Sequence, residues 1–391
     1  MTNPAKLVYR NPDYDGQLVR TVAAASVHSS DLGEALGTAR SIKRLNGSTW
    51  HGAWFAMAIN SKRNADSSLA KGDVASARHA YLRASEYFRQ SYYFVRSNLD
   101  DGRLQESYHE HVRSFEAAIA LMGIRAERVR IPYQGTSLVG YLFASDDLGT
   151  KRPTVLFPCG YDSTAEAGWV NVPAALDHGY NALVFEGPGQ GEALFTQGLF
   201  FRPDYESVLT PVIDWLLTRD DIDPGSLILI GRSFAGYLAP RAAAFEHRLA
   251  ALVVDPAQPN MADRLPSGIA AKAASPVVRI QMRFSESRRE FFGARMAAHG
   301  IRDVGVYFTE LRRYNMLNVA NQISCPTLIV ECENDFAGGS GQDLKDAMST
   351  RTDLVRLGVS QGAEGHCAGL GQEIWSETVY GWLSQVLKNP R

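Results

Sequence analysis

Residues 227–241 read LILIGRSFAGYLAPR, and this stretch decides the fold. Four apolar residues lead directly into Gly231, and Ser233 follows two positions later. Ala235 and Gly236 come next, so the pattern is G-x-S-x-G with alanine in the last place. A serine on a sharp turn between a buried strand and a helix needs small neighbours, because its backbone is strained and the helix passes close by. The stretch therefore predicts a strand, a tight turn and a helix, with Ser233 as a candidate nucleophile. The alternative is an ordinary turn whose serine is solvated.

Short apolar runs recur after residue 125, and each is followed by a loop and a helical pattern. They are residues 154–158, 181–186, 226–231, 251–255, 327–331 and 354–359. Apolar strands that alternate with helices are typical of a mostly parallel sheet covered by helices on both faces. Residues 127–145 alternate instead, which predicts a hairpin with its turn at Gln134 and Gly135. The expected fold class is therefore α/β.

The first part of the chain has a helical pattern. Apolar side chains recur at three- and four-residue steps over residues 73–95 and again over 107–122, which predicts two amphipathic helices. We therefore expect a helical N-terminal domain over 1–125 and an α/β core over 126–391. The gap between strands at about 256–322 is too long for a single crossover, and it predicts a helical cap inserted into the core.

Composition narrows the class of protein. The chain has 391 residues, 45% of them hydrophobic, and a formal net charge of -2. This balance provides no basic surface of the kind that binds nucleic acid or membranes. The first residues hold no apolar stretch typical of a signal peptide, and no apolar run approaches the length of a membrane span. The four cysteines lack CxxC spacing and predict no disulfide framework, which indicates a cytoplasmic location. The apolar stripes of the N-terminal helices make a homodimer the expected assembly.

One loop near the end of the chain offers an acid to orient a histidine. Catalytic groups in sheets of this kind lie beyond the carboxyl ends of the strands. The loop LIVECENDFAGG (328–339) contains three candidates, Glu331, Glu333 and Asp335. Asp335 is preferred because it lies beyond the strand, and Glu333 is the second choice. A solvated loop carboxylate is the alternative for each of them.

His366 is the candidate base. It lies in the glycine-rich segment GVSQGAEGHCAGLGQ (358–372), after the last predicted strand. The order of serine, acid and histidine along the chain is the one that this type of sheet uses. The neighbouring Cys367 is interpreted as a packing residue, because no second base is evident for it.

Two further turns offer groups to a substrate. In LFPCGYDSTAEAGW (156–169) the backbone N–H of Tyr161 is placed to meet a reacting carbonyl, and that of Phe234 follows the serine. Together they predict an oxyanion hole, in which the loss of one donor typically costs about 3–4 kcal/mol of barrier. The loop NALVFEGPGQGEA (181–193) lacks the phosphate-binding pattern G-x-G-x-x-G and places Glu186 near the cleft as a candidate substrate contact. No cluster of residues has metal-ligand spacing.

Several of these segments resemble a known family. The elbow GRSFAG (231–236), the loop FEGPGQGE (185–192) and the GHC loop (365–367) are similar to those of alpha/beta hydrolases. More narrowly, GRSFAGYLAPRAAAFEHRLAALVVDP and GAEGHCAGLGQ resemble the 2,6-dihydroxypseudooxynicotine hydrolases and the fungal heptaketide hydrolases of melanin pathways. The resemblance covers residues 50–385, is weaker in the cap, and does not reach residues 1–45.

The resemblance implies hydrolysis of a carbon–carbon bond beside a ketone in a small aromatic or polyketide substrate, with no metal or organic cofactor. Carried over by position, Ser233 is the nucleophile, Asp335 the orienting acid and His366 the base. Arg232 departs from the pattern. Its guanidinium is expected to pair either with an acidic group of the substrate or with a neighbouring carboxylate.

Two other functions stay open. A carboxylesterase, lactonase or acyltransferase would use the same three residues, whereas a protein that only binds or scaffolds would keep the fold without catalysis. Binding and turnover by a Ser233→Ala variant separate the non-catalytic function from the others. Parallel assays on an aryl 1,3-diketone and a p-nitrophenyl ester separate carbon–carbon hydrolysis from ester hydrolysis.

Overall fold

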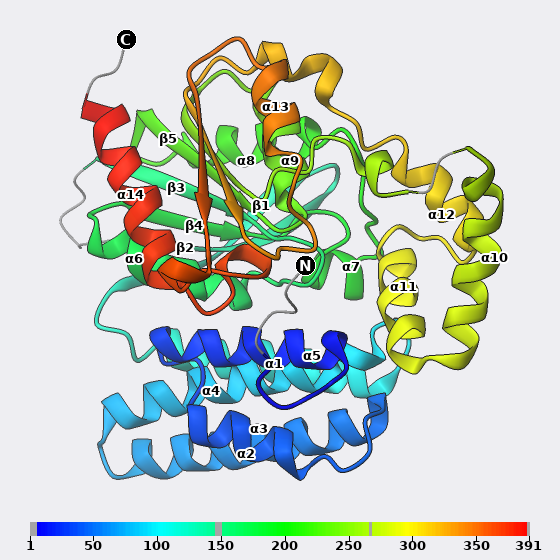
Figure 1. Ribbon diagram of the computed structural model, residues 1–391. Coiled ribbons are helices and arrows are strands. Elements are labelled where there is room, and N and C mark those ends of the chain that lie inside the picture. The colour runs from blue at the N-terminus through cyan, green and yellow to red at the C-terminus, as the bar shows by residue number, and fades with distance from the viewer. Residues whose placement is uncertain (1–5, 145–150, 266–267, 389–391) are drawn as a thin grey trace. The chain divides into compact units, whose positions relative to one another are not determined.

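The computed structural model describes residues 6–144, 151–265 and 268–388 (Figure 1). Within these ranges the chain forms two compact units. The sheet unit comprises Ile124–Leu265 and Thr309–Arg391, and the helical unit comprises Ala5–Gly123 and Pro266–Phe308. The helical unit is therefore assembled from two segments that lie far apart in the sequence.

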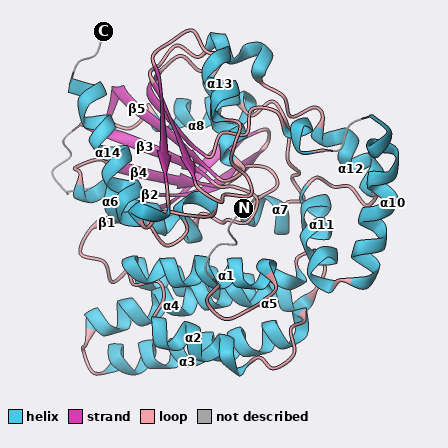
Figure 2. Cartoon of the chain, viewed as in Figure 1, coloured by secondary structure: helices cyan, strands magenta, loops and turns pink. Residues whose placement is uncertain are grey.

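The sheet unit is built on an eight-stranded sheet, ordered β1-β2-β4-β3-β5-β6-β7-β8 among the described residues (Figure 2). The strands are β1 (Arg125–Tyr133), β2 (Thr136–Ala144), β3 (Arg152–Pro158), β4 (Asn181–Phe185), β5 (Ile222–Arg232), β6 (Leu249–Asp255), β7 (Thr327–Cys332) and β8 (Thr352–Leu357). β2 runs antiparallel to both of its neighbours, β1 and β4. All the other neighbouring pairs, from β4 with β3 to β7 with β8, are parallel. The predicted α/β class with a mostly parallel sheet is confirmed, and every predicted apolar run overlaps one of these strands.

The hairpin of β1 and β2 has a two-residue turn. Gln134 has φ 42° and Gly135 has φ 80°. Positive φ at both central residues is the signature of the turn type whose twist matches that of the flanking strands, and glycine adopts it without steric cost. The hairpin therefore turns at the two residues that the sequence predicted.

Helices cover both faces of the sheet, so its central strands are fully buried. On one face α8 (Glu206–Leu216) packs against α9 (Ala235–Ala243), which lies on β5 and β6. On the other, the imidazole of His178 at the end of α6 (Val172–Asp177) stacks on Tyr380 of α14 (Gln372–Lys388). The connections carry shorter helices, η3 (Glu166–Asn171), α7 (Gly191–Phe195), η4 (Met261–Arg264), η5 (Leu317–Gln322), α13 (Gly341–Ala347), η6 (Val359–Gln361) and η7 (His366–Ala368). The helix α12 (Val304–Leu311) begins in the helical unit and ends in the sheet unit.

The helical unit contains the N-terminal helices and two helices from the long segment between β6 and β7. They are α1 (Pro12–Ala23), η1 (Ala24–Val27), α2 (Leu32–Ser41), α3 (Gly47–Ala70), α4 (Val74–Tyr92), η2 (Tyr93–Val95), α5 (Gly102–Ile119), α10 (Gly268–Phe284) and α11 (Glu286–Ala298). The helix predicted over 107–122 begins earlier, because the side chain of Asp101 accepts the backbone N–H of Arg103 at 2.9 Å and caps α5 at that point.

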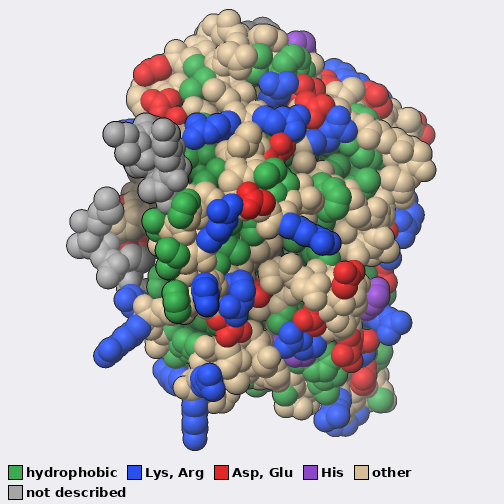
Figure 3. All heavy atoms as spheres, turned by 90° about the vertical axis from the view of Figure 1, so that its right-hand side faces the viewer, with side chains coloured by type: hydrophobic (Ala, Val, Ile, Leu, Met, Phe, Trp, Pro, Cys, Tyr) green, Lys and Arg blue, Asp and Glu red, His purple; other side chains and the backbone are tan. Residues whose placement is uncertain are grey.

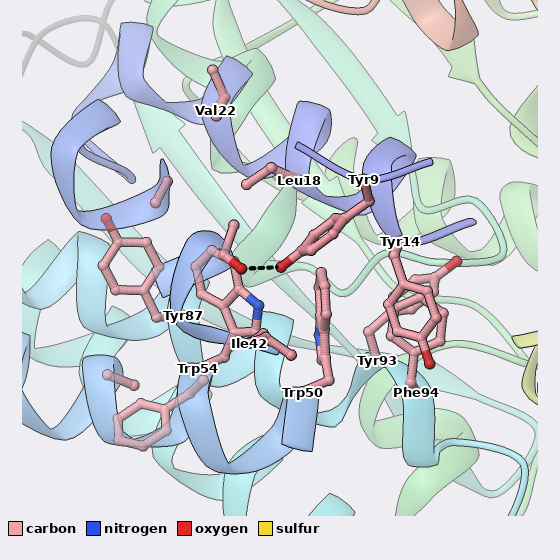
Figure 4. Close-up of a cluster of buried hydrophobic side chains, with 14 of the residues drawn as sticks. Tyr9, Tyr14, Leu18, Val22, Ile42, Trp50, Trp54, Tyr87, Tyr93 and Phe94 are labelled. Carbon is pink, nitrogen blue, oxygen red and sulfur yellow. Dashed lines mark hydrogen bonds between the residues drawn. The ribbon is translucent and has the colours of Figure 1, made fainter. Parts of the chain in front are cut away.

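Aromatic side chains dominate the core of the helical unit. Trp50 and Trp54 are fully buried, and their ring centroids lie 5.7 Å apart. The Tyr9 hydroxyl donates to the carbonyl of Ala39 at 2.6 Å, as the dashed line in Figure 4 marks. Large rings bury much apolar area, while a buried hydroxyl needs a hydrogen-bond partner. This cluster joins the segment before α1 to α2, α3 and α4.

The later segment of the helical unit is tied to the N-terminal helices by carboxylates of α11. Glu286 Oε1 accepts the backbone N–H of Gly47 at 2.7 Å, at the start of α3. Glu290 Oε1 accepts the hydroxyl of Ser97 at 2.8 Å. A carboxylate at a helix N-terminus satisfies an N–H that has no partner within the helix and interacts favourably with the helix dipole.

The outer side of α10 carries both apolar and cationic groups. Val277, Ile280 and Phe284 are exposed along this helix. Figure 3 shows the face that carries α10, where hydrophobic side chains lie beside Lys and Arg side chains. Arg279 of the same helix pairs with Asp303 at 2.6 Å.

Adding a methyl group at Gly236 is expected to destabilise the sheet unit by about 1–3 kcal/mol, the usual cost of overpacking. A Cβ at this position would lie 1.9 Å from the carbonyl oxygen of Pro256, which is backbone and has little freedom to move. The matched control is Gly381→Ala in α14, where a Cβ meets nothing within 4 Å and helix propensity favours alanine by about 1 kcal/mol. Urea denaturation of both variants measures the difference, and equal stabilities would contradict the close packing at Gly236.

Candidate active site

Ser233 lies at a sharp elbow between β5 and α9. Only Ser233 and Phe234 separate the strand from the helix, and Ser233 has φ 59°, in the left-handed region. A Cβ on Gly231 would lie 2.2 Å from the carbonyl oxygen of Ala235, so the small residues of the motif allow the close passage of helix and strand. The Ser233 N–H donates to the carbonyl of Asp255 at the end of β6, at 2.8 Å. A hydrogen bond to the neighbouring strand thus holds the strained backbone of Ser233 in place.

The structure brings Ser233, His366 and Asp335 together. His366 Nε2 lies 2.8 Å from Ser233 Oγ, and Nδ1 lies 2.8 Å from Asp335 Oδ1. The side chain of Asp335 is fully buried, whereas that of His366 is 28% exposed. With the Nδ1 proton directed at the carboxylate, Nε2 is the nitrogen that can accept the serine proton. The arrangement has the geometry of a serine nucleophile, a general base and an orienting acid.

The two other acid candidates have different partners. Glu331 Oε1 accepts the backbone N–H groups of Gly339 at 3.0 Å and Gly341 at 2.7 Å. Glu333 Oε2 accepts the N–H of Val359 at 3.1 Å. Both glutamates therefore hold loop backbone, and of the three candidates Asp335 is the one within hydrogen-bond distance of the imidazole.

The pKa of His366 lies well above its ordinary value. Burial alone would lower the pKa, but the electrostatic interactions and hydrogen bonds of the imidazole with Cys367 and Asp335 outweigh this and favour the protonated imidazole. The neutral form, which a general base requires, is therefore favoured only as the pH rises. The interactions that raise this pKa also stabilise the imidazolium that forms when His366 takes a proton.

The predicted oxyanion turn lies against the elbow. A Cβ on Gly160 would be 3.2 Å from the Cβ of Ser233 and 3.4 Å from the backbone nitrogen of Phe234. The rings of Tyr161 and Phe234 stack with centroids 3.9 Å apart. The absence of a side chain at Gly160 lets the two backbones approach, and it brings together the two residues whose N–H groups were predicted to act as a pair.

Glu186 is fully buried, and both of its carboxylate oxygens accept backbone N–H groups. Oε1 accepts from Ala165 at 3.0 Å and Oε2 from Glu192 at 2.7 Å. Burial, followed by the charge of Glu166, raises the pKa of Glu186 to about 8. These contacts favour a role in joining two loops beside the sheet over the substrate contact expected from the sequence.

The guanidinium of Arg232 contacts other protein groups, whereas the sequence left open a contact with the substrate. Its Nε lies 3.5 Å from Oδ2 of the buried Asp255, and its Nη2 donates to the carbonyl of Cys367 at 2.7 Å. The alternative, pairing with a neighbouring carboxylate, is the one that the structure favours.

Sequence reasoning missed Phe336 and Asp255. Phe336 is 68% exposed, and the centroid of its ring lies 4.6 Å from that of His366. The available signal for Phe336 was an aromatic residue directly after the candidate acid in an otherwise polar and glycine-rich loop. Asp255 is the last residue of a predicted strand, so its position at a strand end was a signal that the sequence contained.

Within the described ranges, no group of three or more His, Cys, Asp or Glu side chains is arranged to hold a metal ion. Over the same ranges, no helix combines the length and apolar character needed to cross a bilayer.

The chain belongs to the alpha/beta hydrolase family, whose model matches residues 154–371. The predicted hydrolase class is confirmed, and the protein is a hydrolase.

Fungal hydrolases are among its relatives. Hydrolase acrC of Aspergillus aculeatus is 29% identical over 427 aligned positions, which cover 98% of each chain. Alpha/beta hydrolase ucsC of an Acremonium species is 33% identical, and xenA of Xenoacremonium sinensis is 34% identical. These two alignments cover 65% and 62% of this chain and 56% and 59% of those relatives, so the chain spans less than two thirds of their length.

Solved structures show the same fold. The crystal structure of 2,6-dihydroxy-pseudo-oxynicotine hydrolase matches with a TM-score of 0.74 and 22% identity, over 95% of each chain. AbyA5 matches with a TM-score of 0.63 and 16% identity, over 91% of this chain and 94% of that one. The predicted resemblance to the pseudooxynicotine hydrolases thus extends to the architecture of nearly the whole chain.

Proposed function

We propose that this protein is a serine hydrolase that cleaves a carbon–carbon bond beside a carbonyl in an aromatic ketone or polyketide-type substrate. The observation that carries the proposal is the continuous contact from Ser233 Oγ through His366 to the buried Asp335, with 2.8 Å at each step. The similarity of the elbow and the GHC loop to carbon–carbon hydrolases supports the choice of bond. The relationship to fungal hydrolases and the shared fold of the pseudooxynicotine hydrolase agree with it.

The first half of the reaction forms an acyl-enzyme. His366 Nε2 takes the proton of Ser233 as Oγ attacks the substrate carbonyl, and Asp335 stabilises the resulting imidazolium. The backbone N–H groups of Tyr161 and Phe234 receive the negative oxygen of the tetrahedral intermediate. When this intermediate collapses, the carbon–carbon bond breaks, its electron pair leaves with the departing carbon, and His366 protonates that carbon.

The second half consumes water. The neutral His366 takes a proton from a water molecule, whose oxygen attacks the acyl carbon of Ser233. The new tetrahedral intermediate expels Ser233 Oγ, which recovers a proton from the imidazolium. The products are a carboxylic acid and a neutral arene or ketone, and the sum of the two halves is the addition of one water across the broken bond.

An exposed aromatic ring supports an aromatic substrate. Phe336 directly follows Asp335 and presents a largely exposed ring beside the imidazole of His366. Stacked aromatic pairs gain about 0.5–1.5 kcal/mol beyond the burial of their area. A substrate ring placed against Phe336 would hold the adjoining carbonyl near Ser233.

The same three residues would form an acyl-enzyme from an ester, so an esterase, lactonase or acyltransferase is the alternative. The two functions differ in the leaving group. An alkoxide departs readily with one proton from the imidazole, whereas a carbanion departs only when a hydroxylated ring or a second carbonyl delocalises its charge.

We expect kcat/KM to follow the ability of the leaving carbon to hold negative charge. An aryl 1,3-diketone and an ortho-hydroxyaryl ketone should be cleaved, and an unactivated alkyl ketone should not. Steady-state kinetics across this series, with a p-nitrophenyl ester in parallel, measure the preference. Reaction in oxygen-18 water should place the label in the carboxylic acid product. Turnover of simple esters far faster than of every activated ketone would replace the proposal with the esterase or acyltransferase alternative.

A further inference from the structure

The loop that carries His366 has a strained backbone. Cys367 has φ 51° and ψ 51°, and Ala368 has φ 65°. Gly365 and Gly369 on either side also have positive φ, at 82° and 52°. Two consecutive side-chain-bearing residues in the left-handed region are unfavourable, and such a conformation persists only where surrounding contacts determine it. The orientation of His366 therefore depends on what holds the next residue.

The peptide groups of Cys367 are held on both sides. Its N–H donates to Asp335 Oδ2 at 3.2 Å, the oxygen that does not face the imidazole. Its carbonyl accepts from Arg232 Nη2 at 2.7 Å and from Gln372 Nε2 at 3.0 Å. The acid loop thus holds one side of the strained residue, and the residue before the nucleophile holds the other.

Arg232 is itself fixed by groups from three other elements. Nη1 donates to Asn171 Oδ1 at 2.8 Å, and Nη2 also donates to Gln372 Oε1 at 3.0 Å. The guanidinium lies over the ring of Trp375, 4.1 Å from its centroid. Its Nε faces the buried carboxylate of Asp255 at 3.5 Å. A planar fork of donors can make these contacts at once, whereas the point charge of a lysine cannot.

We propose that Arg232 is a positioning residue for the general base. Arg232 is adjacent to Ser233 in the chain, and it donates a hydrogen bond to the carbonyl of Cys367, which is adjacent to His366. One side chain therefore couples the strand of the nucleophile to the strained loop of the base. This role does not depend on which bond the enzyme cleaves, because it concerns the approach of Nε2 to Oγ, and Arg232 itself touches no reacting atom.

Replacing Arg232 by glutamine should lower kcat by about 10²-fold, the effect that a misplacement of about 1 Å has on a reacting group. KM should change little, since the guanidinium is directed at the protein. The rate at which a fluorophosphonate probe labels Ser233 should fall in parallel, and this measurement requires no natural substrate. Arg232→Lys should not restore the rate, because it keeps the charge beside Asp255 but loses the fork.

The matched control is Arg241→Gln in the same unit. Arg241 makes a two-point pair with Glu206, at 2.9 and 2.6 Å, and its side chain is 18% exposed compared with 14% for Arg232. This variant removes a similar, partly buried pair that joins α9 to α8. Its labelling rate should equal that of the unaltered protein.

Two further measurements separate positioning from a loss of folding. In Arg232→Ala, free guanidinium at concentrations well below those that unfold the protein should recover part of the labelling rate. In Arg232→Gln, the downfield proton resonance of the His366 Nδ1–H···Asp335 bond should broaden or disappear, while thermal unfolding stays cooperative.

Gln372→Leu provides an independent test should the arginine variants not fold. It removes the second donor to the Cys367 carbonyl and should lower the labelling rate by a smaller factor. A folded Arg232→Gln variant with an unchanged labelling rate would overturn the proposal, as would unchanged labelling in Gln372→Leu. An effect on KM alone would assign Arg232 to substrate binding instead.

Discussion

Replacing Ser233 or His366 by alanine is expected to lower kcat by several orders of magnitude and to leave the protein folded. In a serine hydrolase whose triad acts as one unit, loss of the nucleophile or the base costs about 10⁶-fold in kcat. Oγ and Nε2 lie 2.8 Å apart, so neither can act without the other. The double variant should therefore be no less active than either single one. Single-turnover and steady-state kinetics on the best substrate measure the losses.

The protein contains a matched control for this experiment. His247 Nδ1 lies 3.2 Å from the hydroxyl of Ser324 at an exposed site of the same sheet unit. His247→Ala and Ser324→Ala remove a similar pair, and both should retain full activity. A Ser233→Ala or His366→Ala variant that keeps most of its activity at saturating substrate would remove that residue from the mechanism.

Asp335→Asn is expected to lower kcat by about 10⁴-fold, the cost of holding the histidine in the wrong tautomer. The side-chain amide of asparagine accepts the Nδ1–H hydrogen bond only when its oxygen faces the imidazole. The substitution also removes a negative charge that helps to raise the pKa of His366. Since the neutral imidazole is the active base, a lower pKa should move the rising limb of the pH–rate profile to lower pH. The profile of kcat/KM against pH, measured on both proteins, detects this shift.

Glu333→Gln is the control for the acid, because Glu333 holds the N–H of Val359 in the same region. It should retain most of the activity. Greater damage from Glu333→Gln than from Asp335→Asn would show that the orienting acid was assigned wrongly. If both are harmless, the acid comes from another strand, and the buried Asp255 at the end of β6 is the group to replace next.

The elbow and the strands could be predicted because their requirements are local. A buried strand needs a continuous apolar run, and the turn after it needs small residues, as Gly231 and Gly236 confirm by the contacts a Cβ would make there. The positive φ values of Gln134 and Gly135 likewise follow from a two-residue turn. Each of these signals lies within a few positions of the structure that it determines.

The helices of residues 1–45 were not predicted, although two of them have recognisable starts. Asn11 caps α1 with proline at the first helical position, and Asp31 caps α2 by accepting the N–H of Glu34. These helices are short, and their apolar residues form no long stripe. Their stability comes from tertiary packing, in which Tyr14 and Leu18 join the aromatic core of the helical unit.

The surroundings of the site could not be predicted for a different reason. Arg232 and Ser233 are adjacent in the sequence, but the partners of Arg232 include groups from the end of η3, from the end of β6 and from α14. No short pattern relates Arg232 to Gln372, because only the order of strands in the sheet brings their elements together. The sequence therefore left open whether Arg232 meets the substrate or the protein.

The two-segment origin of the helical unit has a consequence for how the protein is made. Glu286 contacts Gly47 across 239 positions of the chain, and Glu290 contacts Ser97 across 193. Domains generally fold as units while the chain leaves the ribosome, beginning at the N-terminus. Here the five α-helices from α1 to α5 emerge long before α11 is translated, and strands of the sheet unit are made in between. A nascent chain halted before residue 266 therefore carries helices whose closing contacts do not yet exist.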